Sequence, residues 1–191
     1  MTAYLLVHPP RHPSLRFAGA RLAGFLAAAA APFRRRWPWA ADLARLEWAL
    51  VDAFDARDAP PLTRERLARV PLAGWPELRL AFHASVRIMC LAWPVHVTRA
   101  GWERGEPPPP PAGAGATWVC VWRRAERVRY RAVEPLEADV LEAAIAGAPF
   151  SALCTRAAQA LGDDAAPAFV AERVGRWLGD ELLREGRLPG D

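Results

Sequence analysis

The spacing of apolar and polar residues changes along the chain, and it predicts helices over most of the length with short strands in the middle. Between residues 117 and 133, two runs rich in β-branched and aromatic residues flank a short polar turn, which predicts a β-hairpin. In the predicted pairing, one face sets indoles and a thiol opposite arginines: Trp118 with Arg131, Cys120 with Arg129 and Trp122 with Arg127. The other face is aliphatic, with Val119 opposite Tyr130 and Val121 opposite Val128, because side chains alternate along a strand.

The arginine and indole face of this hairpin has two interpretations. It is either a sheet surface covered by the rest of the chain or a docking surface for an extended acidic peptide. Exposed arginine–indole contacts add roughly 0.5–1 kcal/mol each. The functional hypothesis below depends on the second interpretation.

Before the hairpin, helical and strand periods alternate. A helix after Ser14 carries apolar residues at 15, 18, 22 and 25, and the clearest helix runs from Ala41 to about Ala56. Its apolar stripe comprises Leu43, Leu46, Leu50 and Phe54. Thr63 is a predicted cap for a short helix to Val70. Strands are expected at 78–82 and 86–90, and a short helix or turn ends near Trp102.

After the hairpin, three helices are predicted, at about 135–146, 150–161 and 167–185. The fold class is therefore α+β: an N-terminal helical part plus a small antiparallel sheet, with a C-terminal hairpin and three helices in a winged-helix-like order. Five consecutive prolines and two nearby glycines predict a semi-rigid linker at 107–116. It separates a partner-docking part, 1–106, from a peptide-recognition part, 117–191.

Composition changes this picture little. The formal net charge of +4 rests on 25 basic residues, all of them arginine, and favours acidic partners slightly. The three cysteines are far apart and odd in number, which fits a reducing cytoplasm better than a disulfide framework. No signal peptide or membrane span is expected, since the alanine run at 27–31 is too short.

Three local features have structural and functional interpretations. Glu47 lies on the apolar stripe of its helix, and we expect a partly buried ion pair with an arginine such as Arg16 or Arg21 rather than an acid catalyst. Arg34–Arg36 reads as a solvated turn between buried indoles or as a contact for an acidic partner. His83, at the end of a predicted strand, is expected to have a hydrogen-bonded structural role.

The sequence offers no catalytic constellation. Residues 113–115 lack the later glycine and lysine of a phosphate loop, and neither a nucleophile elbow nor HExxH occurs. Arginines near Cys120 would lower the pKa of its thiol, but no histidine is close in sequence. His8 and His12 have the spacing of a metal pair on a helix, which the intervening prolines prevent. We therefore predict no catalytic residue and no metal ligand in this chain.

Seven segments resemble the HvfC/BufC-type proteins, also called DUF2063. In the order of that family they are HPPRHPSLR (8–16), ADLARLEWA (41–49), DAPPL (58–62), WPELRL (75–80), HASVR (83–87), WPV (93–95) and VWRR (121–124). Members usually carry a further helical N-terminal region, and residues 1–7 begin where that region would end. The short form is similar to the accessory subunit of methanobactin biosynthesis.

The resemblance implies a heterodimer with a TIM-barrel, multinuclear non-haem iron oxidase of the DUF692 kind. Such a pair modifies cysteines of a ribosomally made precursor peptide, in the methanobactin branch to oxazolone and thioamide groups that bind copper. The iron belongs to the oxidase, so no cofactor is expected in this chain. The expected location is the cytoplasm.

Two binding functions follow as hypotheses. In the first, the leader of the precursor peptide adds as a strand beside the hairpin. Its contacts would be Trp118, Cys120, Trp122, Arg123, Arg127, Arg129, Tyr130 and Arg131. The oxidase would contact the proline-rich start and the exposed end of the 41–56 helix, through His8, Pro9, Pro10, Arg11, His12, Ser14, Asp52 and Asp55. The alternative is a DNA-binding regulator, although the helix 150–161 carries only Arg156.

Overall fold

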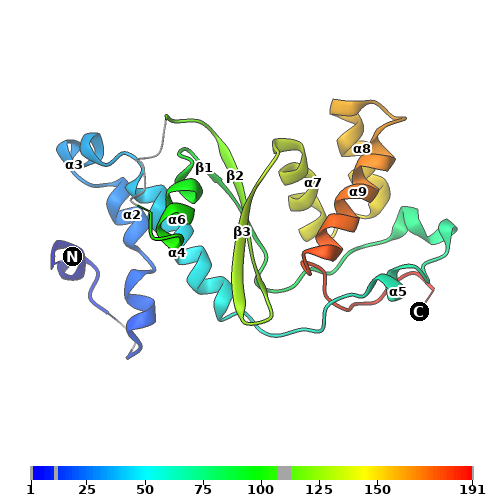
Figure 1. Cartoon of the computed structure of the whole chain (residues 1–191), viewed down its shortest axis with the longest axis horizontal. Coiled ribbons are helices and arrows are strands. Elements are labelled where there is room, and N and C mark those ends of the chain that lie inside the picture. The colour runs from blue at the N-terminus through cyan, green and yellow to red at the C-terminus, as the bar shows by residue number, and fades with distance from the viewer. Residues whose placement is uncertain (1, 11–12, 107–112, 191) are drawn as a thin grey trace. The chain divides into compact units, whose positions relative to one another are not determined.

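The computed structural model describes residues 2–10, 13–106 and 113–190 and has the predicted α+β class (Figure 1). Its three strands form one sheet in the order β1-β2-β3. They are β1 (Arg87–Leu91), β2 (Thr117–Arg124) and β3 (Arg127–Val133). By internal contacts the chain forms two compact units, each built from two stretches of sequence. Unit 1 contains 1–52 and 90–117, and unit 2 contains 53–89 and 118–191.

These units differ from the linear division at 107–116 that the sequence suggested. Most of that proline-rich stretch, 107–112, lies outside the described residues, so its predicted role as a linker stays a prediction. Unit 2 draws its two stretches together through short backbone pairings. Leu183 pairs with Phe82, and Arg184 pairs with Pro61.

Unit 1 is mainly helical. Its helices are α1 (Thr2–Val7), α2 (Leu22–Ala27), α3 (Ala31–Arg36), the greater part of α4 (Ala40–Phe54) and α6 (Val95–Glu103), with a 3₁₀ helix, η1, at Leu15–Gly19. The single helix predicted after Ser14 is therefore wrong, because η1 and α2 divide it. Arg34–Arg36 are exposed as predicted, but they form the last turn of helix α3 rather than a loop, and Trp37 beside them is 42% exposed rather than buried.

Helix α4 is the predicted long helix, and its N-terminus is fixed by Asp42. The Asp42 carboxylate accepts hydrogen bonds from the backbone N–H groups of Ala92 (2.7 Å) and Trp93 (3.1 Å), just after β1. Arg45 donates to the carbonyl oxygen of Cys90 at 3.0 Å. Leu46 and Leu50 are buried as predicted, whereas Phe54 is 54% exposed.

Unit 2 contains the hairpin and the C-terminal helices α7 (Pro135–Ile145), α8 (Phe150–Leu161) and α9 (Ala166–Gly179), together with α5 (Arg64–Leu67) and the 3₁₀ helix η2 (Leu72–Glu77). Helix α8 packs against both α7 and α9. The Thr63 side chain caps α5, accepting a hydrogen bond from the N–H of Arg66. The helix α9 ends earlier than the predicted 185, because Glu181 takes a φ of +60° and the chain then continues extended.

The hairpin is present, but the predicted pairing is wrong by two residues. Its turn contains only Ala125 and Glu126, so Trp118 pairs with Val133, Cys120 with Arg131 and Trp122 with Arg129. A shift of two residues preserves the faces, because the side-chain period of a strand is two. The strand predicted at 78–82 is absent; this segment makes only the isolated bridge at Phe82.

The indole face of the hairpin belongs to the core of unit 2. Cys120 is fully buried and Trp122 is 5% exposed, and both pack in the cluster that includes Leu141, Val170 and Trp177. Val119 and Val121, on the opposite face, are also fully buried. Both faces of β2 are therefore covered, and β3 is one of the two outer strands of the sheet, with β1 the other.

Candidate functional site

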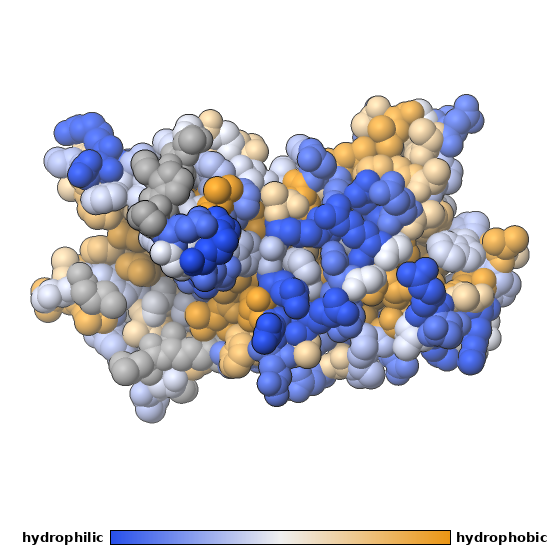
Figure 2. Space-filling view, in the orientation of Figure 1, coloured by the Kyte–Doolittle hydropathy of each residue, from blue (hydrophilic) through white to orange (hydrophobic). Residues whose placement is uncertain are grey.

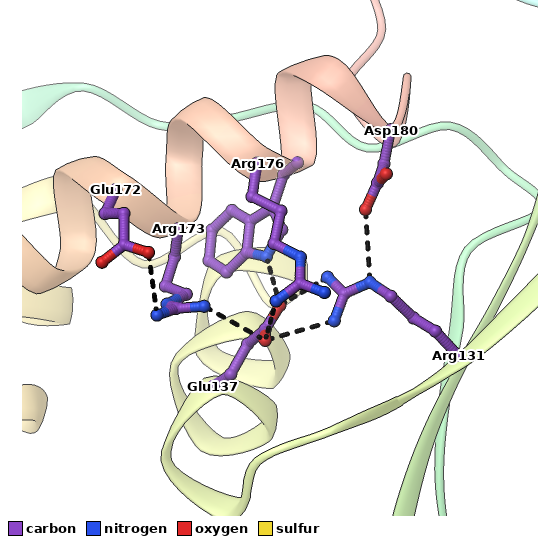
Figure 3. A network of polar contacts seen from close by, with 7 residues as sticks. Arg131, Glu137, Glu172, Arg173, Arg176 and Asp180 are labelled. Carbon is purple, nitrogen blue, oxygen red and sulfur yellow. Dashed lines mark hydrogen bonds and ion pairs between the residues drawn. The ribbon is translucent and has the colours of Figure 1, made fainter.

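Strand β3 is attached to the helices of unit 2 through a buried carboxylate (Figure 3). Glu137, in the first turn of α7, is 1% exposed. Arg131 of β3 donates to both carboxylate oxygens of Glu137, at 2.5 and 3.2 Å, and to Asp180 at 3.2 Å. The indole N–H of Trp177 donates to the same carboxylate at 3.2 Å. These bonds fix the middle of β3 against α7 and α9.

The buried carboxylate has further positive neighbours on α9. Arg173 and Arg176 each place a guanidinium nitrogen 3.7 Å from Oε2 of Glu137. Burial by itself would raise the pKa of Glu137, but the hydrogen bonds and charge of Arg131, with Trp177 and Arg176, outweigh it and lower that pKa. The carboxylate is therefore ionised and fully partnered.

This network corrects part of the predicted peptide site. Cys120 and Trp122 face the core and do not reach a guest, and Arg131 is already bound to Glu137 and Asp180. Burial raises the pKa of Cys120 to about 12, outweighing the nearby charge of Arg131. The expectation that arginines would lower this pKa is therefore wrong. The indole face is a covered surface, the first of the two interpretations.

Arg123 is also occupied by the chain itself. Its guanidinium donates to the carbonyl oxygens of Phe54 (3.0 Å) and Ala56 (2.9 Å), at and just beyond the end of α4, and to the carboxylate of Asp58. An arginine here satisfies carbonyl groups that a helix end leaves without intrahelical donors. Arg123 thereby ties the turn end of β2 to the loop that follows α4.

The backbone of Arg123 continues this connection to His83. Its N–H donates to Oγ of Ser85 (2.9 Å), which lies 2.8 Å from Nδ1 of His83. The backbone N–H of Ser85 also donates to Nδ1, at 3.2 Å. Burial, and then the charge of Arg123, lower the pKa of His83. The hydrogen-bonded role predicted for His83 is present.

A cavity of about 430 Å³ lies beside this cluster. It is lined by residues 58–61, His83, Arg123, Ala125 and Glu181. Three of the segments that carried the family resemblance, 58–62, 83–87 and 121–124, meet here although they are far apart in sequence. Ala125 and Glu181 both have positive φ, +50° and +60°.

The exposed part of the predicted peptide site is the outer strand. On it Arg127 and Arg129 are exposed, and Val128 and Tyr130 are partly exposed. Trp118, also predicted to contact the peptide, is on the central strand β2 and packs against the core. Figure 2 shows hydrophilic surface over β3 and the adjoining front of α9. Within the described residues β3 pairs only with β2, so its other edge is available for a further strand.

The residues predicted to contact the oxidase lie in unit 1 and at the end of α4. Pro9, Pro10, Ser14 and Asp55 are exposed, and His8 and Asp52 are half-buried. Arg11 and His12 lie outside the described residues. The ring of His8 packs against Tyr4, with centroids 5.3 Å apart.

Sequence reasoning missed Glu137 and Asp180. A signal for Glu137 was present, because it shares a helical stripe with Val140, Leu141 and Ala144, all fully buried. Nothing in the sequence singled out Asp180.

Glu47 forms the predicted ion pair, but with an arginine that was not predicted: Nε of Arg99, on α6, lies 2.7 Å from Oε1 of Glu47. Burial raises the pKa of Glu47 despite this pair.

The described part of the chain was also compared with the requirements for metal binding, disulfide formation, DNA binding and membrane crossing. It holds no group of three or more histidine, cysteine or acidic side chains placed to bind a metal ion. The three cysteines are free. Arg156, the single arginine of α8, is bound to Asp139 at 2.7 Å, so α8 offers no free cation for reading DNA. Among these residues, no helix combines the length and apolarity that crossing a bilayer requires.

Comparison with protein families gives a match to the second half of the chain. Residues 85–178 match the model of the HvfC C-terminal domain, a span that includes the whole sheet, α6, α7, α8 and most of α9. No curated protein matches the sequence. The matched span contains the outer strand β3, Arg131 and Glu137, and one side of the Arg123 cluster. Residues 85–178 are therefore similar to the HvfC C-terminal domain, which supports an HvfC-type protein.

Proposed function

We propose that this chain is a non-catalytic, cytoplasmic accessory subunit that binds a multinuclear non-haem iron oxidase and the leader of a ribosomally made precursor peptide. The oxidase, a TIM barrel of the DUF692 kind, supplies the iron and the chemistry. Cysteines of the peptide become oxazolone and thioamide groups, as in methanobactin synthesis. The HvfC-type match supports the accessory role. The oxidase partner, the leader peptide and the cysteine chemistry are our inference.

The open edge of β3 is the observation that carries the peptide-binding part of this proposal. An extended peptide that adds to a sheet edge gains main-chain hydrogen bonds, while side chains along the edge select its sequence. Arg127 and Arg129 are exposed there, so an acidic leader is favoured. Val128 and Tyr130, which are half-buried on β3, supply the apolar part of the contact.

The surroundings of β3 suit such a role because they hold the strand rigid. Arg131 fixes its middle to Glu137 and Asp180, and Arg123 fixes the turn end of the neighbouring strand to the loop after α4. A rigid strand loses less conformational entropy on binding a guest than a mobile one. The buried network therefore prepares the edge, although its own residues do not touch the peptide.

The test is a binding measurement with the cognate precursor peptide, labelled for fluorescence anisotropy. We expect low-micromolar binding by the unaltered chain. The double change Arg127→Glu and Arg129→Glu should raise Kd at least about tenfold, equivalent to ~1.4 kcal/mol. Arg64→Glu with Arg69→Glu, at two exposed arginines in the same unit, changes the charge by the same amount and is the matched control, which should leave Kd within about twofold.

Two results would count against the proposal. One is the absence of binding by the unaltered chain at these concentrations. The other is an equal loss in the control and the β3 variant, which would show a general charge effect rather than a site on β3.

A further inference from the structure

Unit 1 has an apolar groove that the proposed peptide site does not use. It has a volume of about 430 Å³ and lies between α2 and the adjacent face of α4. Its apolar lining comprises Leu22, Leu26, Trp39, Leu43, Trp48 and Val51. Glu47 is the single charged residue in the lining, and its charge is paired with Arg99.

The groove exists because α4 is apolar on two faces. Leu46, Leu50 and Ala53 form one face and are at most 7% exposed. Leu43, Trp48 and Val51 form the other, which is only partly covered; Val51 is 40% exposed. A helix that is apolar on both sides is expected to be buried on both. Figure 2 shows hydrophobic residues at the surface over α4.

The unit that contains this groove carries an excess of positive charge. Unit 1 contains nine arginines and five acidic residues, whereas unit 2 contains sixteen of each, so the whole formal net charge of +4 lies in unit 1. Arg34, Arg35 and Arg36 are exposed in the last turn of α3. None of the ion pairs in the described part of the chain involves these three residues.

One of these arginines, Arg36, is connected to one end of the groove through two tryptophan side chains. The guanidinium of Arg36 lies 5.0 Å from the ring centroid of Trp37, which is 5.5 Å from the ring of Trp39. Trp39 lines the groove, and Val51 lies at the other end of the same face of α4. The apolar surface therefore has a basic end beside Trp39.

We propose that this groove receives an amphipathic helix of the iron oxidase, with acidic residues at the end beside Arg34–Arg36. The lining runs from Ala40 to Val51 along α4, which at ~1.5 Å per residue accommodates about three turns of a guest helix. A guest of this kind would cover the open face of α4 and place acidic side chains beside Arg34–Arg36. The inference rests on the proposed function, since the oxidase is the partner.

The test measures binding of the purified oxidase to the full chain by calorimetry, with variants matched in residue type. Val51→Glu places a charge in the groove, and Val97→Glu places the same charge on α6, at a residue that is 52% exposed and outside the groove. We expect Val51→Glu to raise Kd at least tenfold and Val97→Glu to change it less than about twofold. Circular dichroism verifies that both variants fold.

A double variant tests whether the basic end of the groove contributes to oxidase binding. Arg34→Glu with Arg35→Glu should slow association about tenfold at low salt, and the effect should shrink at high salt. Oxidase binding that is unchanged in Val51→Glu, or equally weakened in Val97→Glu, would overturn the groove and leave the accessory role standing. Failure of the unaltered chain to bind the oxidase would overturn both.

Discussion

Glu137 shows how a single buried charge fixes the position of the proposed binding strand. An ionised carboxylate is costly to bury unless charged and hydrogen-bonded partners compensate for its lost hydration. Here Arg131 comes from β3 and Trp177 from α9, while Glu137 itself is on α7. One side chain thus holds three elements, including the strand whose outer edge is proposed to bind the peptide.

Replacing this carboxylate should destabilise unit 2. We expect Glu137→Gln to lower the free energy of unfolding by about 3–5 kcal/mol, because the half-buried Arg131 loses one of its two charge partners and keeps only Asp180. Urea denaturation measures this difference. Glu142→Gln, at an exposed position of the same helix, is the control and should cost less than about 0.5 kcal/mol. Equal costs for the two variants would contradict the buried network.

The same residue predicts a pH dependence. Because folding lowers the pKa of Glu137, its contribution to stability is present above the ordinary carboxyl value of 4.5 and is lost as the pH falls toward the lower folded pKa. The gap in melting temperature between the unaltered chain and Glu137→Gln should therefore shrink below about pH 4.5. A gap that stays constant from pH 7 to 3.5 would contradict an ionised Glu137.

Cys120 should be chemically inert in the folded chain. Its thiol is fully buried and its pKa is raised to about 12, so almost no thiolate is present at neutral pH. With a maleimide reagent at pH 7.5, Cys120 should react at least about a hundredfold more slowly than the partly exposed Cys90. Mass spectrometry of peptides after timed quenching measures both rates, and rapid labelling of Cys120 would contradict its placement.

At the scale of elements, the hairpin turn carries a backbone cost. Ala125 has a φ of +50°, in the left-handed region that a residue with a Cβ adopts at a cost and glycine adopts readily. A positive φ at the first of the two turn residues and not at the second is the pattern of a type II′ turn, which matches the twist of the flanking strands. The hairpin thus accepts local strain to keep β2 and β3 in register.

Ala125→Gly should therefore stabilise the chain in spite of the greater flexibility of glycine when unfolded. We expect a gain of up to about 1 kcal/mol in the free energy of unfolding, measured by urea denaturation. Ala132→Gly, at an exposed position within β3, is the comparison variant and should lower the free energy of unfolding by about 0.5–1 kcal/mol. Destabilisation by Ala125→Gly would show that the turn is not strained.

Most elements were predictable from residue spacing, and the failures have identifiable causes. Helix α8 begins and ends where the apolar period and Gly162 indicate. The faces of the hairpin were predicted and its register was not, since alternation fixes only odd and even positions and a two-residue shift keeps them. The strand predicted at 78–82 alternates correctly but finds only one bridging partner, at Leu183.

The candidate site was only partly predictable because its parts come from distant segments. The sequence indicated Arg127 and Arg129 on β3, but it placed Cys120 and Trp122 on an open face that α7 and α9 cover. The helices cover this face with the help of the contacts of Arg131 with Glu137 and Asp180, residues spread over nearly fifty positions of the chain. No local sequence pattern predicts contacts of this range. The same holds for Arg123, whose partners lie at residues 54–58 and 85.

At the scale of the whole molecule, the two units divide the proposed work. Unit 2 has balanced charge, a rigid sheet and an open strand edge, which suits the ordered recognition of a peptide backbone. Unit 1 carries the net positive charge and the apolar groove, which suits docking of a folded partner. Under the proposed function, such a chain brings the precursor peptide and the oxidase together, and the oxidation takes place on the oxidase.

Hydrogen–deuterium exchange, with and without the cognate precursor peptide, tests peptide binding at the β3 edge most directly. In the free chain, outward-facing amides of 127–133 lack a strand partner and should exchange rapidly. Saturating peptide should slow exchange there at least about tenfold and leave α5 unchanged. Tight binding of the peptide with no change in the exchange of β3, or with protection confined to another element, would contradict the proposed site.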